Sequence, residues 1–342
     1  MGAIMRNLTI IVLLLIGTSA AADTTGQQRA EAAGRGLVGA PAPRLVVKTI
    51  DGETIDLGSL YGKKAVYLKF WATWCVPCRE QMPHFEHTYE TAGPDLAVIA
   101  INAGFDDSLE EIQRYRHQFG ITMPIVLDDG RLDAAFNLRV TPQHIVIGRD
   151  GLIQFVGHLA DQRLDAALLA ARAPPPATGT IGGTGAQPPI DAPHYGVGDQ
   201  LPVQSVKTLE GKSFQFQKHG AAQPTVFVFL SPWCESYLAT TRPAISASCR
   251  NAREQVSALA RARHARWLGV ASGLWATPED LRKYQADYKV RIPLTLDESG
   301  MLFRAFRVTN VPTVLVADAS GKIVRRVEFD DTPGLRAALN GL

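Results

Sequence analysis

The order of apolar and polar positions predicts strands and helices that alternate along the first half of the chain. Short apolar runs are typical of buried strands, and longer amphipathic stretches are typical of helices. The pattern predicts strands over residues 65–70, 96–101, 144–147 and 152–156 and helices over residues 75–92, 109–119 and 161–171. The last two strands flank Asp150-Gly151, a turn signal typical of a hairpin. This order predicts an α/β domain with a mixed sheet and helices on both faces.

The second half of the chain repeats the first. The matched segments are Val38-Gly39 with Val197-Gly198, Val47–Gly52 with Val206–Gly211, and Trp74-Cys75 with Trp233-Cys234, all at the same separation. After an insertion between Pro243 and Pro293 the match resumes, and Pro142 corresponds to Pro312. A repeat of this length predicts a duplicated domain rather than a solenoid.

Shifts in composition divide the chain into five parts. Residues 174–195 are rich in Pro and Gly and lack apolar periodicity, so we interpret them as a linker. The predicted parts are a signal peptide at residues 1–22, a disordered lead-in at 23–36, a first domain at 37–173, the linker at 174–195 and a second domain at 196–342. Each domain is long enough to bury its own core.

The first 22 residues have the pattern of a secretory signal peptide. Arg6 precedes an apolar run at residues 8–16, and small residues end at Ala22. We predict cleavage after Ala22 and a periplasmic or otherwise exported mature chain. An uncleaved membrane anchor is disfavoured because the apolar run is shorter than the roughly 20 residues that span a bilayer. No later stretch predicts a stable membrane span.

Composition narrows the function classes. The 342-residue chain has a formal net charge of +2, with 46% hydrophobic and 20% charged residues. The charge is nearly balanced and no long basic run is present, which argues against nucleic acid as a partner. Four cysteines are too few to staple a scaffold of this size, so we expect at least one pair to do chemistry in an exported chain.

The candidate chemistry lies in a Trp-Cys-Val-Pro-Cys segment, with Cys75 and Cys78 as catalytic residues and Trp74 and Pro77 as supporting ones. Two cysteines three positions apart on one helix face can reach disulfide separation. The motif follows a strand and opens a helix, so unpaired backbone N–H groups favour the thiolate form of Cys75. Pro77 fits the first helical turn because its missing N–H costs nothing there. We therefore expect Cys75 to attack a substrate disulfide and Cys78 to resolve the mixed disulfide, with no cofactor beyond this redox-active pair.

Two other interpretations of the motif are less well supported. A zinc site needs two further ligands at suitable spacing. The sequence has no second Cys-x-x-Cys and no Cys/His cluster, so we expect no metal. A purely structural disulfide between residues so close in sequence adds little stability, because it closes a very short loop.

At these residues the chain resembles the exported TlpA/ResA/CcmG-like branch of the thioredoxin superfamily. Residues 70–83, Phe-Trp-Ala-Thr-Trp-Cys-Val-Pro-Cys-Arg-Glu-Gln-Met-Pro, and the later Val140-Thr141-Pro142 carry the resemblance. It implies two tandem thioredoxin-like domains, each a mixed central sheet flanked by helices, the second domain being degenerate. It also implies a cis peptide between Thr141 and Pro142 that faces the dithiol, with an extended substrate segment pairing beside it.

The resemblance also implies partners and a direction. Protein disulfides are the implied substrates, and a membrane thiol transporter is the implied electron donor. The implied direction is reduction of cysteines that await haem, as in cytochrome c maturation, or copper. The sequence fixes neither the direction nor the reduction potential, because related proteins range from about −270 mV to about −120 mV.

Three residues near the motif have open interpretations. Lys69 replaces the buried acid that thioredoxins place before the first cysteine, and it either assists proton movement at the dithiol or extends along the strand to solvent. Glu80 either relays protons near Cys78 or, as we favour, stabilises the helix dipole. His144 follows Pro142 closely, and we expect a hydrogen-bonded core histidine rather than a member of the site.

The second copy lacks the resolving cysteine. Tyr237 stands at the position of Cys78, so this domain cannot run the same cycle. A straight helix between Cys234 and Cys249 would hold them about 22 Å apart and prevent a bond. A Thr-Thr-Arg-Pro segment before Cys249 is typical of a helix start. If the helix begins there, residues 235–242 form a loop that permits a Cys234–Cys249 disulfide, redox-active or structural; otherwise Cys234 is a monothiol able to trap a partner.

The leading hypothesis is a periplasmic thiol–disulfide oxidoreductase that acts on protein substrates as a reductant. The first alternative is a client-binding or chaperone protein whose second domain holds a client in its altered groove. The second alternative is a metallochaperone that binds Cu(I) through soft cysteine ligands.

Overall fold

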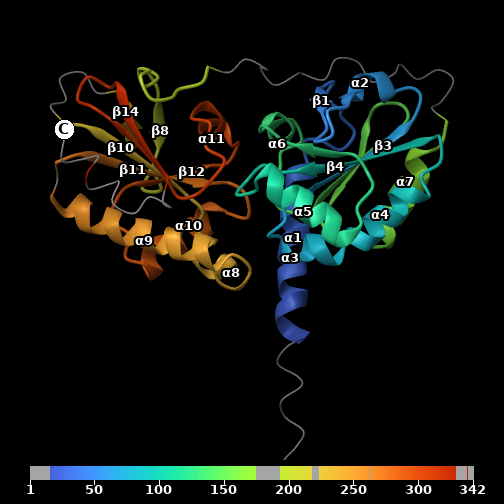
Figure 1. Ribbon diagram of the computed structural model, residues 1–342, viewed down its shortest axis with the longest axis horizontal. Helices are drawn as coiled ribbons and strands as arrows, with labels where there is room; N and C mark the ends of the chain where they lie inside the picture. The colour runs from blue at the N-terminus through green and yellow to red at the C-terminus, as the bar shows by residue number, and fades with distance from the viewer. Residues whose placement is uncertain (1–15, 175–192, 218–222, 263, 329–336, 338–342) are drawn as a thin grey trace, which may run out of the picture.

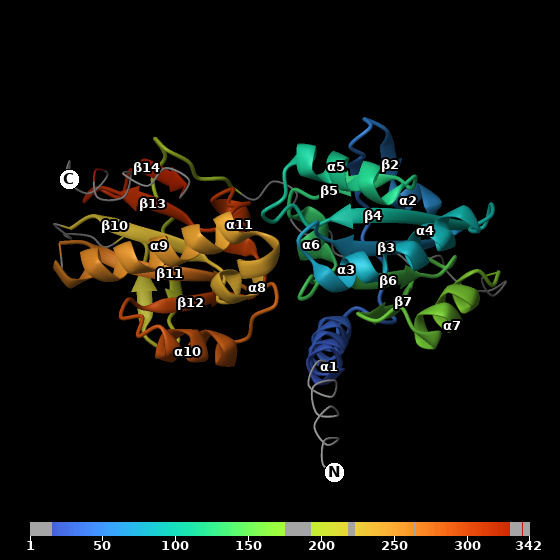
Figure 2. The same ribbon diagram turned by 60° about the horizontal axis from the view of Figure 1, so that its bottom comes forward.

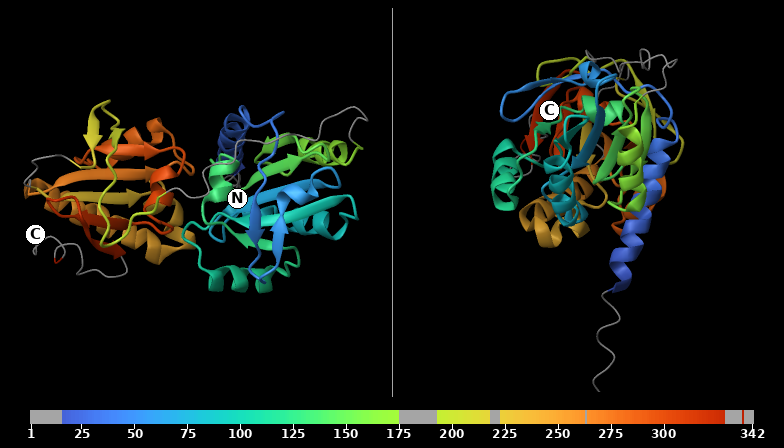
Figure 3. Two further views of the ribbon diagram at one scale, coloured as in Figure 1. Left: turned by 90° about the horizontal axis from the view of Figure 1, so that it is seen from above. Right: turned by 90° about the vertical axis from the view of Figure 1, so that its right-hand side faces the viewer.

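The computed structural model describes residues 16–174, 193–217, 223–262, 264–328 and 337. Two lobes lie side by side, and each is built around its own five-stranded sheet (Figures 1 and 3). The expected α/β fold, with a mixed central sheet flanked by helices in each half, is confirmed. Most of the predicted linker and most of the predicted signal peptide lie outside the described residues.

The first sheet has the strand order β5-β4-β3-β6-β7. Its strands are β3 (Ala65–Trp71), β4 (Leu96–Asn102), β5 (Ile125–Leu127), β6 (Gln143–Ile147) and β7 (Ile153–Gly157). β3 lies in the centre, parallel to β4 and antiparallel to β6, and every residue of β3 is buried. Its continuous apolar run is what a strand covered on both faces requires.

Apart from two short helices at residues 57–60 and 131–135, which were not predicted, the sequence predicts the helices of the first domain. They are α2 (Leu57–Leu60), α3 (Val76–Glu80), α4 (Met82–Glu90), α5 (Leu109–Phe119), α6 (Arg131–Ala135) and α7 (Gln162–Ala171), and a hairpin of β1 (Val46–Lys48) and β2 (Thr54–Asp56) accompanies them. A capping box of Ser108 and Glu111 starts α5. The single helix predicted over residues 75–92 is instead divided at Gln81, because Pro83 has no N–H with which to continue the hydrogen-bond ladder.

The lead-in expected to be disordered is helical. α1 (Ile16–Gly34) runs through most of residues 23–36 and packs on β7. Ala30 and Ala33 are buried, and the side-chain oxygen of Gln27 accepts a hydrogen bond from the backbone N–H of His158 at 2.9 Å. The prediction of disorder was wrong because this helix draws its stability from tertiary packing, which its weakly amphipathic sequence does not reveal.

The second domain repeats the architecture of the first, with the strand order β12-β11-β10-β13-β14. Its strands are β8 (Ser205–Lys207), β9 (Ser213–Gln215), β10 (Thr225–Leu230), β11 (Arg266–Ser272), β12 (Leu294–Asp297), β13 (Thr313–Ala317) and β14 (Ile323–Glu328). Its helices are α8 (Cys234–Thr241), α9 (Pro243–Leu259), the 3-10 turn η1 (Ala260–Ala262), α10 (Pro278–Asp287) and α11 (Met301–Ala305). The register is also repeated, since Lys69 pairs with His144 in the first sheet and Val228 with Val314 in the second.

The two domains face each other through the ends that carry their cysteines. α8 of the second domain lies beside α3 of the first (Figures 1 and 2). α1 adds a second connection, because Arg29 forms a 2.8 Å ion pair with Asp280 of α10. Within the described ranges, no helix combines the length and the apolar character needed to cross a membrane.

Candidate active site

The two cysteines of the motif form a disulfide at the start of α3. Cys75 caps the helix, and its Sγ accepts a hydrogen bond from the backbone N–H of Cys78 at 3.2 Å. Pro77 occupies the first turn, as predicted. The short loop after a buried strand thus presents one sulfur to the free N–H groups of a helix start, the environment that stabilises a thiolate.

The cis-proline loop lies against this disulfide. The Thr141–Pro142 peptide is cis, which confirms the expectation from the resemblance. The carbonyl oxygen of Thr141 lies 3.3 Å from the Sγ of Cys75. The loop therefore places backbone polar groups directly beside the sulfur that would react, where an extended peptide can pair with them.

Lys69 is fully buried on β3 and does not extend to solvent. Its Nζ has no hydrogen-bond partner among the described residues and lies 5.1 Å from the ring centre of Phe85. Burial lowers the pKa of Lys69 to about 7. The amine therefore titrates near neutral pH, the range in which a proton acceptor for a thiol is useful.

The other predicted neighbours have structural positions. His144 is buried and bonds through its two ring nitrogens to the Tyr67 hydroxyl and the Gln81 amide oxygen, each at 2.8 Å. It is the hydrogen-bonded core histidine that we expected, and burial holds its pKa well below the usual value. Glu80 is exposed at the last residue of α3, and its role stays a prediction.

Aromatic side chains of the two domains meet above the motif. Trp74 is buried and donates from Nε1 to the carbonyl oxygen of Phe105 at 2.7 Å. Its ring centre lies 5.0 Å from that of Trp233, and Tyr237 packs edge-on against both tryptophans. Tyr237, the residue that replaces the resolving cysteine, also accepts a hydrogen bond from the N–H of Val76 at 3.1 Å.

A loop of the second domain covers the cis-proline edge. The backbone N–H of Trp275 donates to the carbonyl oxygen of Arg139 at 2.8 Å, and its indole N–H donates to the Thr141 hydroxyl at 3.3 Å. These contacts and the aromatic cluster leave Cys75 only 1% exposed and Cys78 fully buried. The second domain thus occupies the edge at which a client strand would pair.

The first domain makes a nearly symmetric contact with the cis-proline segment of the second domain. The backbone N–H of Asp106 donates to the carbonyl oxygen of Thr309 at 2.9 Å, and its carboxylate accepts from the N–H of Val311 at 2.9 Å. Asp106 and Trp275 occupy corresponding loops after β4 and β11, and both have positive φ angles. The interface is therefore pseudo-twofold, with each domain docking a loop on the other's cis-proline segment.

Arg242 is the main polar connection across this interface. It lies between α8 and α9 and contacts Thr73, Asp107 and Glu111 of the first domain. The Asp107 carboxylate is buried, and it also accepts hydrogen bonds from the N–H of Thr73 and the amide of Asn102. Sequence reasoning missed these contacts because Asp106 and Trp275 differ in residue type although their positions correspond, and Arg242 was noted only as part of a helix start.

The second domain contains a Cys234–Cys249 disulfide with a Cα–Cα distance of 6.3 Å. The disulfide left open by the sequence is thus present, but the loop expected at residues 235–242 is wrong. That segment is helical as α8, and the chain turns at Arg242 before α9. The turn at Arg242, rather than an open loop, brings α9 back so that Cys249 meets Cys234.

The first domain is similar in sequence to known thioredoxin-like proteins. A family model described as AhpC/TSA family matches residues 38–156. The thioredoxin-like protein YneN of Bacillus subtilis is 35% identical over 117 residues, which cover 34% of this chain and 68% of that protein. The thiol-disulfide oxidoreductase ResA of Halalkalibacterium halodurans is 35% identical over 131 residues, covering 37% and 73%. A crystal structure of a thioredoxin-family thiol:disulfide interchange protein from Chlorobium tepidum is 28% identical with a TM-score of 0.34, covering 39% and 97%.

Proposed function

Because this chain belongs to the thioredoxin-like thiol–disulfide oxidoreductases, we propose that it reduces disulfides of exported proteins through Cys75 and Cys78. One observation carries the proposal. The Cys75–Cys78 disulfide stands at a helix start with its Cys75 sulfur 3.3 Å from the Thr141 carbonyl oxygen of a cis-proline loop. This arrangement combines a stabilised thiolate with a backbone edge for an extended substrate.

The reaction proceeds from the reduced dithiol. The Cys75 thiolate attacks one sulfur of a client disulfide, and the client's other sulfur leaves as a thiolate. The Cys78 thiolate then attacks the Cys75 sulfur, which releases the second client sulfur and forms the Cys75–Cys78 disulfide. Two electrons pass to the client, and two protons end on its thiols.

Lys69 is the proposed proton acceptor for Cys78. Its uncharged amine, buried on the strand that precedes the motif and without a hydrogen-bond partner among the described residues, can take the thiol proton as Cys78 becomes nucleophilic. The low pKa of about 7, caused by burial, keeps a large fraction of the amine uncharged at neutral pH.

The second domain must move for a folded client to react. Trp275 already uses the carbonyl oxygen of Arg139, and Cys75 is almost fully covered. We therefore include in the proposal an opening of the interface, after which the freed surface of the second domain, with Trp233 and Tyr237, holds the client.

The N-terminal pattern of residues 1–22 supports export, and the resemblance to the TlpA/ResA/CcmG-like branch supports reduction as the direction. In an oxidising compartment a reductant needs electrons from elsewhere, so we propose a membrane thiol transporter as donor. Cysteines that await haem, as in cytochrome c maturation, or copper are the proposed clients.

The test is reduction of insulin disulfides by the full chain supplied with dithiothreitol. Cys75→Ser should lower the rate at least about a thousandfold, because it removes the nucleophile. Cys78→Ser should accumulate a mixed disulfide between Cys75 and the client, visible on a non-reducing gel. Equal rates for wild type and Cys75→Ser would reject the proposal. The Cys75–Cys78 potential, measured against glutathione, decides the direction.

A further inference from the structure

The second disulfide repeats the arrangement of the first with the roles of its cysteines exchanged. The Sγ of Cys249 lies 3.9 Å from the carbonyl oxygen of Val311, and the Val311–Pro312 peptide is cis. Thr141 and Pro142 occupy the equivalent positions beside Cys75. Cys249, from α9, thus stands at its own cis-proline loop, although Cys234 is the residue that matches Cys75 in sequence.

Burial also distinguishes Cys249 from Cys234. Cys234 is fully buried, with its Sγ 3.9 Å from the carbonyl oxygen of Ile245, whereas Cys249 is 8% exposed. In an exchanging pair, the sulfur that is attacked must be reachable and the other must act as leaving group. Cys249 is therefore the more accessible of the two buried cysteines and suits the attacked position, whereas Cys234 suits the leaving group.

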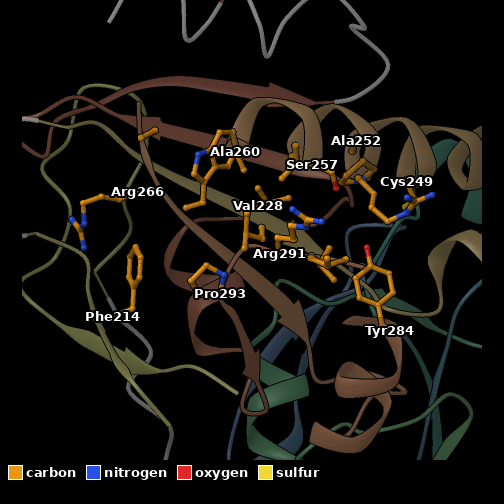
Figure 4. Close-up of a pocket in the computed structure, with 18 of the residues that line it drawn as sticks. Phe214, Val228, Cys249, Ala252, Ser257, Ala260, Arg266, Tyr284, Arg291 and Pro293 are labelled. Atoms are coloured by element: carbon orange, nitrogen blue, oxygen red, sulfur yellow. The ribbon is translucent and has the colours of Figure 1, made fainter. Parts of the chain in front are cut away.

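A cavity of about 750 Å³ leads to Cys249. Its lining includes Cys249 and Pro312 but not Cys234. Cys249 and Tyr284 lie at one end, and Phe214 and Arg266 lie at the opposite end (Figure 4). We call this space the Cys249 cavity.

The charged side chains that line the Cys249 cavity favour ligands of opposite charge. Its walls are largely apolar, but they carry four arginines and one acid: Arg253, Arg261, Arg266, Arg291 and Glu235. Glu235 is already held by Arg253 at 2.6 Å and 3.1 Å. The remaining positive charge attracts an anion and repels a cation.

We propose that Cys234–Cys249 is a second redox-active disulfide, which exchanges with small anionic thiols that enter through the Cys249 cavity. A protein strand does not fit this role in the closed interface, because Asp106 already occupies the carbonyl of Thr309 and the N–H of Val311. A small thiol that carries a carboxylate meets both requirements, since it passes the cavity and complements the arginines.

The step balances with two small thiols. The first, as its thiolate, attacks the Sγ of Cys249, and the Cys234 thiolate leaves and takes up a proton. The second thiolate attacks the small-molecule sulfur of the mixed disulfide, releases the Cys249 thiolate and forms a small-molecule disulfide. The protein disulfide gains two electrons and two protons, and the two thiols lose them.

The experiment uses the full chain with Cys75→Ser and Cys78→Ser, so that only the second disulfide remains. The folded protein is incubated with glutathione, quenched with acid and mapped by mass spectrometry. The expected product is a glutathione mixed disulfide on Cys249, with Cys234 as the free thiol. A disulfide that resists glutathione until the protein is unfolded, or glutathione found on Cys234, would overturn the proposal.

The charge of the cavity is tested with Arg291→Gln in the same background. Arg291 is exposed, so the substitution spares the core. It should slow reaction with glutathione by about threefold at low ionic strength and leave the rate with uncharged 2-mercaptoethanol unchanged. Arg250→Gln, on an exposed position of α9 outside the lining, is the matched control and should change neither rate. Equal slowing with both thiols, or no slowing with glutathione, would rule out recognition of the anion.

Discussion

The two domains share the same arrangement of strands but differ in the positions of their cysteines and in the side chains of their central strands. Both have the same strand order, the same register and a cis-proline after the corresponding loop. The first domain joins its cysteines within one helical turn, while the second joins Cys234 and Cys249 across the turn between two helices. Duplication thus preserved the cis-proline loop and a disulfide beside it, but built that disulfide from a different pair of positions.

The central strands show a second difference. The face of β3 toward α4 and α5 carries Tyr67, Lys69 and Trp71, and the corresponding positions of β10 are Val226, Val228 and Leu230. In the first domain these large side chains fill the space between the strand and the two helices, since Tyr67 and Lys69 contact Phe85 and Trp71 contacts Tyr115. In the second domain the smaller residues leave room for the Cys249 cavity. The volume of the side chains at equivalent positions therefore determines whether the space between the central strand and its covering helices is filled or contains a cavity.

Replacement of Lys69 by methionine should give the largest change. Burial lowers the pKa of Lys69 from 10.5 to about 7, so between these values the unfolded chain binds more protons than the folded one. Stability of the wild type should therefore rise with pH across this window, by up to about 1.4 kcal/mol per pH unit. Lys69→Met should remove this contribution and stabilise the protein near pH 7. Urea unfolding of the wild type and of Lys69→Met at pH 7, 8 and 9 measures the difference in free energy of unfolding.

The matched control is Val228→Met at the corresponding position of the second domain, which changes no charge. It should leave the pH dependence as in the wild type. If Lys69→Met retained the full wild-type slope, the buried amine would not be its source.

Asp106 should make closure of the two domains depend on pH. Burial, opposed by the hydrogen bond from Val311, raises its pKa to about 8. The closed form then binds the proton more tightly than an opened form with solvated Asp106, so closure should weaken as pH rises from about 4 to about 8, by at most about 1.4 kcal/mol per pH unit. Asp106→Asn should remove this trend.

The readout for Asp106 is the alkylation rate of reduced Cys75 in a Cys78→Ser background. The ratio of variant to parent rates at each pH cancels titration of the thiol itself. A ratio that stays constant from pH 5 to pH 8 would show that Asp106 does not control closure.

Arg242→Ala should open the interface by about 2 kcal/mol, because it removes a charged partner from the buried Asp107 while that carboxylate keeps its other hydrogen bonds. Alkylation of Cys75 should accelerate by about 30-fold. The same substitution at exposed Arg250 should have little effect. Similar acceleration by both variants would mean that general loss of positive charge, rather than the contact, is responsible.

Filling the Cys249 cavity with a larger side chain should have the smallest effect on stability. Ala252→Leu places its side chain in the Cys249 cavity and should change stability by less than about 1 kcal/mol, in the stabilising direction. Ala171→Leu, a buried helical alanine in the closely packed first domain, should destabilise by about 1–3 kcal/mol. Thermal unfolding of both variants tests the contrast, which would be lost if both destabilised equally.

The sequence predicted the longer strands and helices of the first domain well because these elements have local signals, whereas short elements such as α2, β5 and α6 were not predicted. The apolar run of β3, the capping box of α5 and the Asp-Gly turn before β7 each specify an element without reference to distant residues. The dithiol and the cis-proline could be predicted because residues 70–83 and the separate Val140-Thr141-Pro142 segment both resemble a known family. The break at Gln81 was missed although Pro83 marks it, because the helical pattern continues on both sides.

The interface could not be predicted from one sequence. Trp275, Asp106 and Arg242 act through contacts with the other domain, and nothing in their own neighbourhoods indicates a partner. The same holds for α1, which is stabilised by β7, and for the exchange of roles between Cys234 and Cys249, which depends on where α9 returns. These features depend on how distant segments of the chain pack together, and the local pattern of apolar residues does not reveal that packing.

The near-symmetric interface also has a consequence for assembly. An isologous contact of this kind is how two identical subunits form a closed dimer, and here one chain supplies both halves. Covalent attachment keeps the halves together at any protein concentration. Whenever the halves separate, however, each accepts the corresponding half of another molecule equally well, so reciprocal domain swapping between two chains is the form of oligomer that this contact favours.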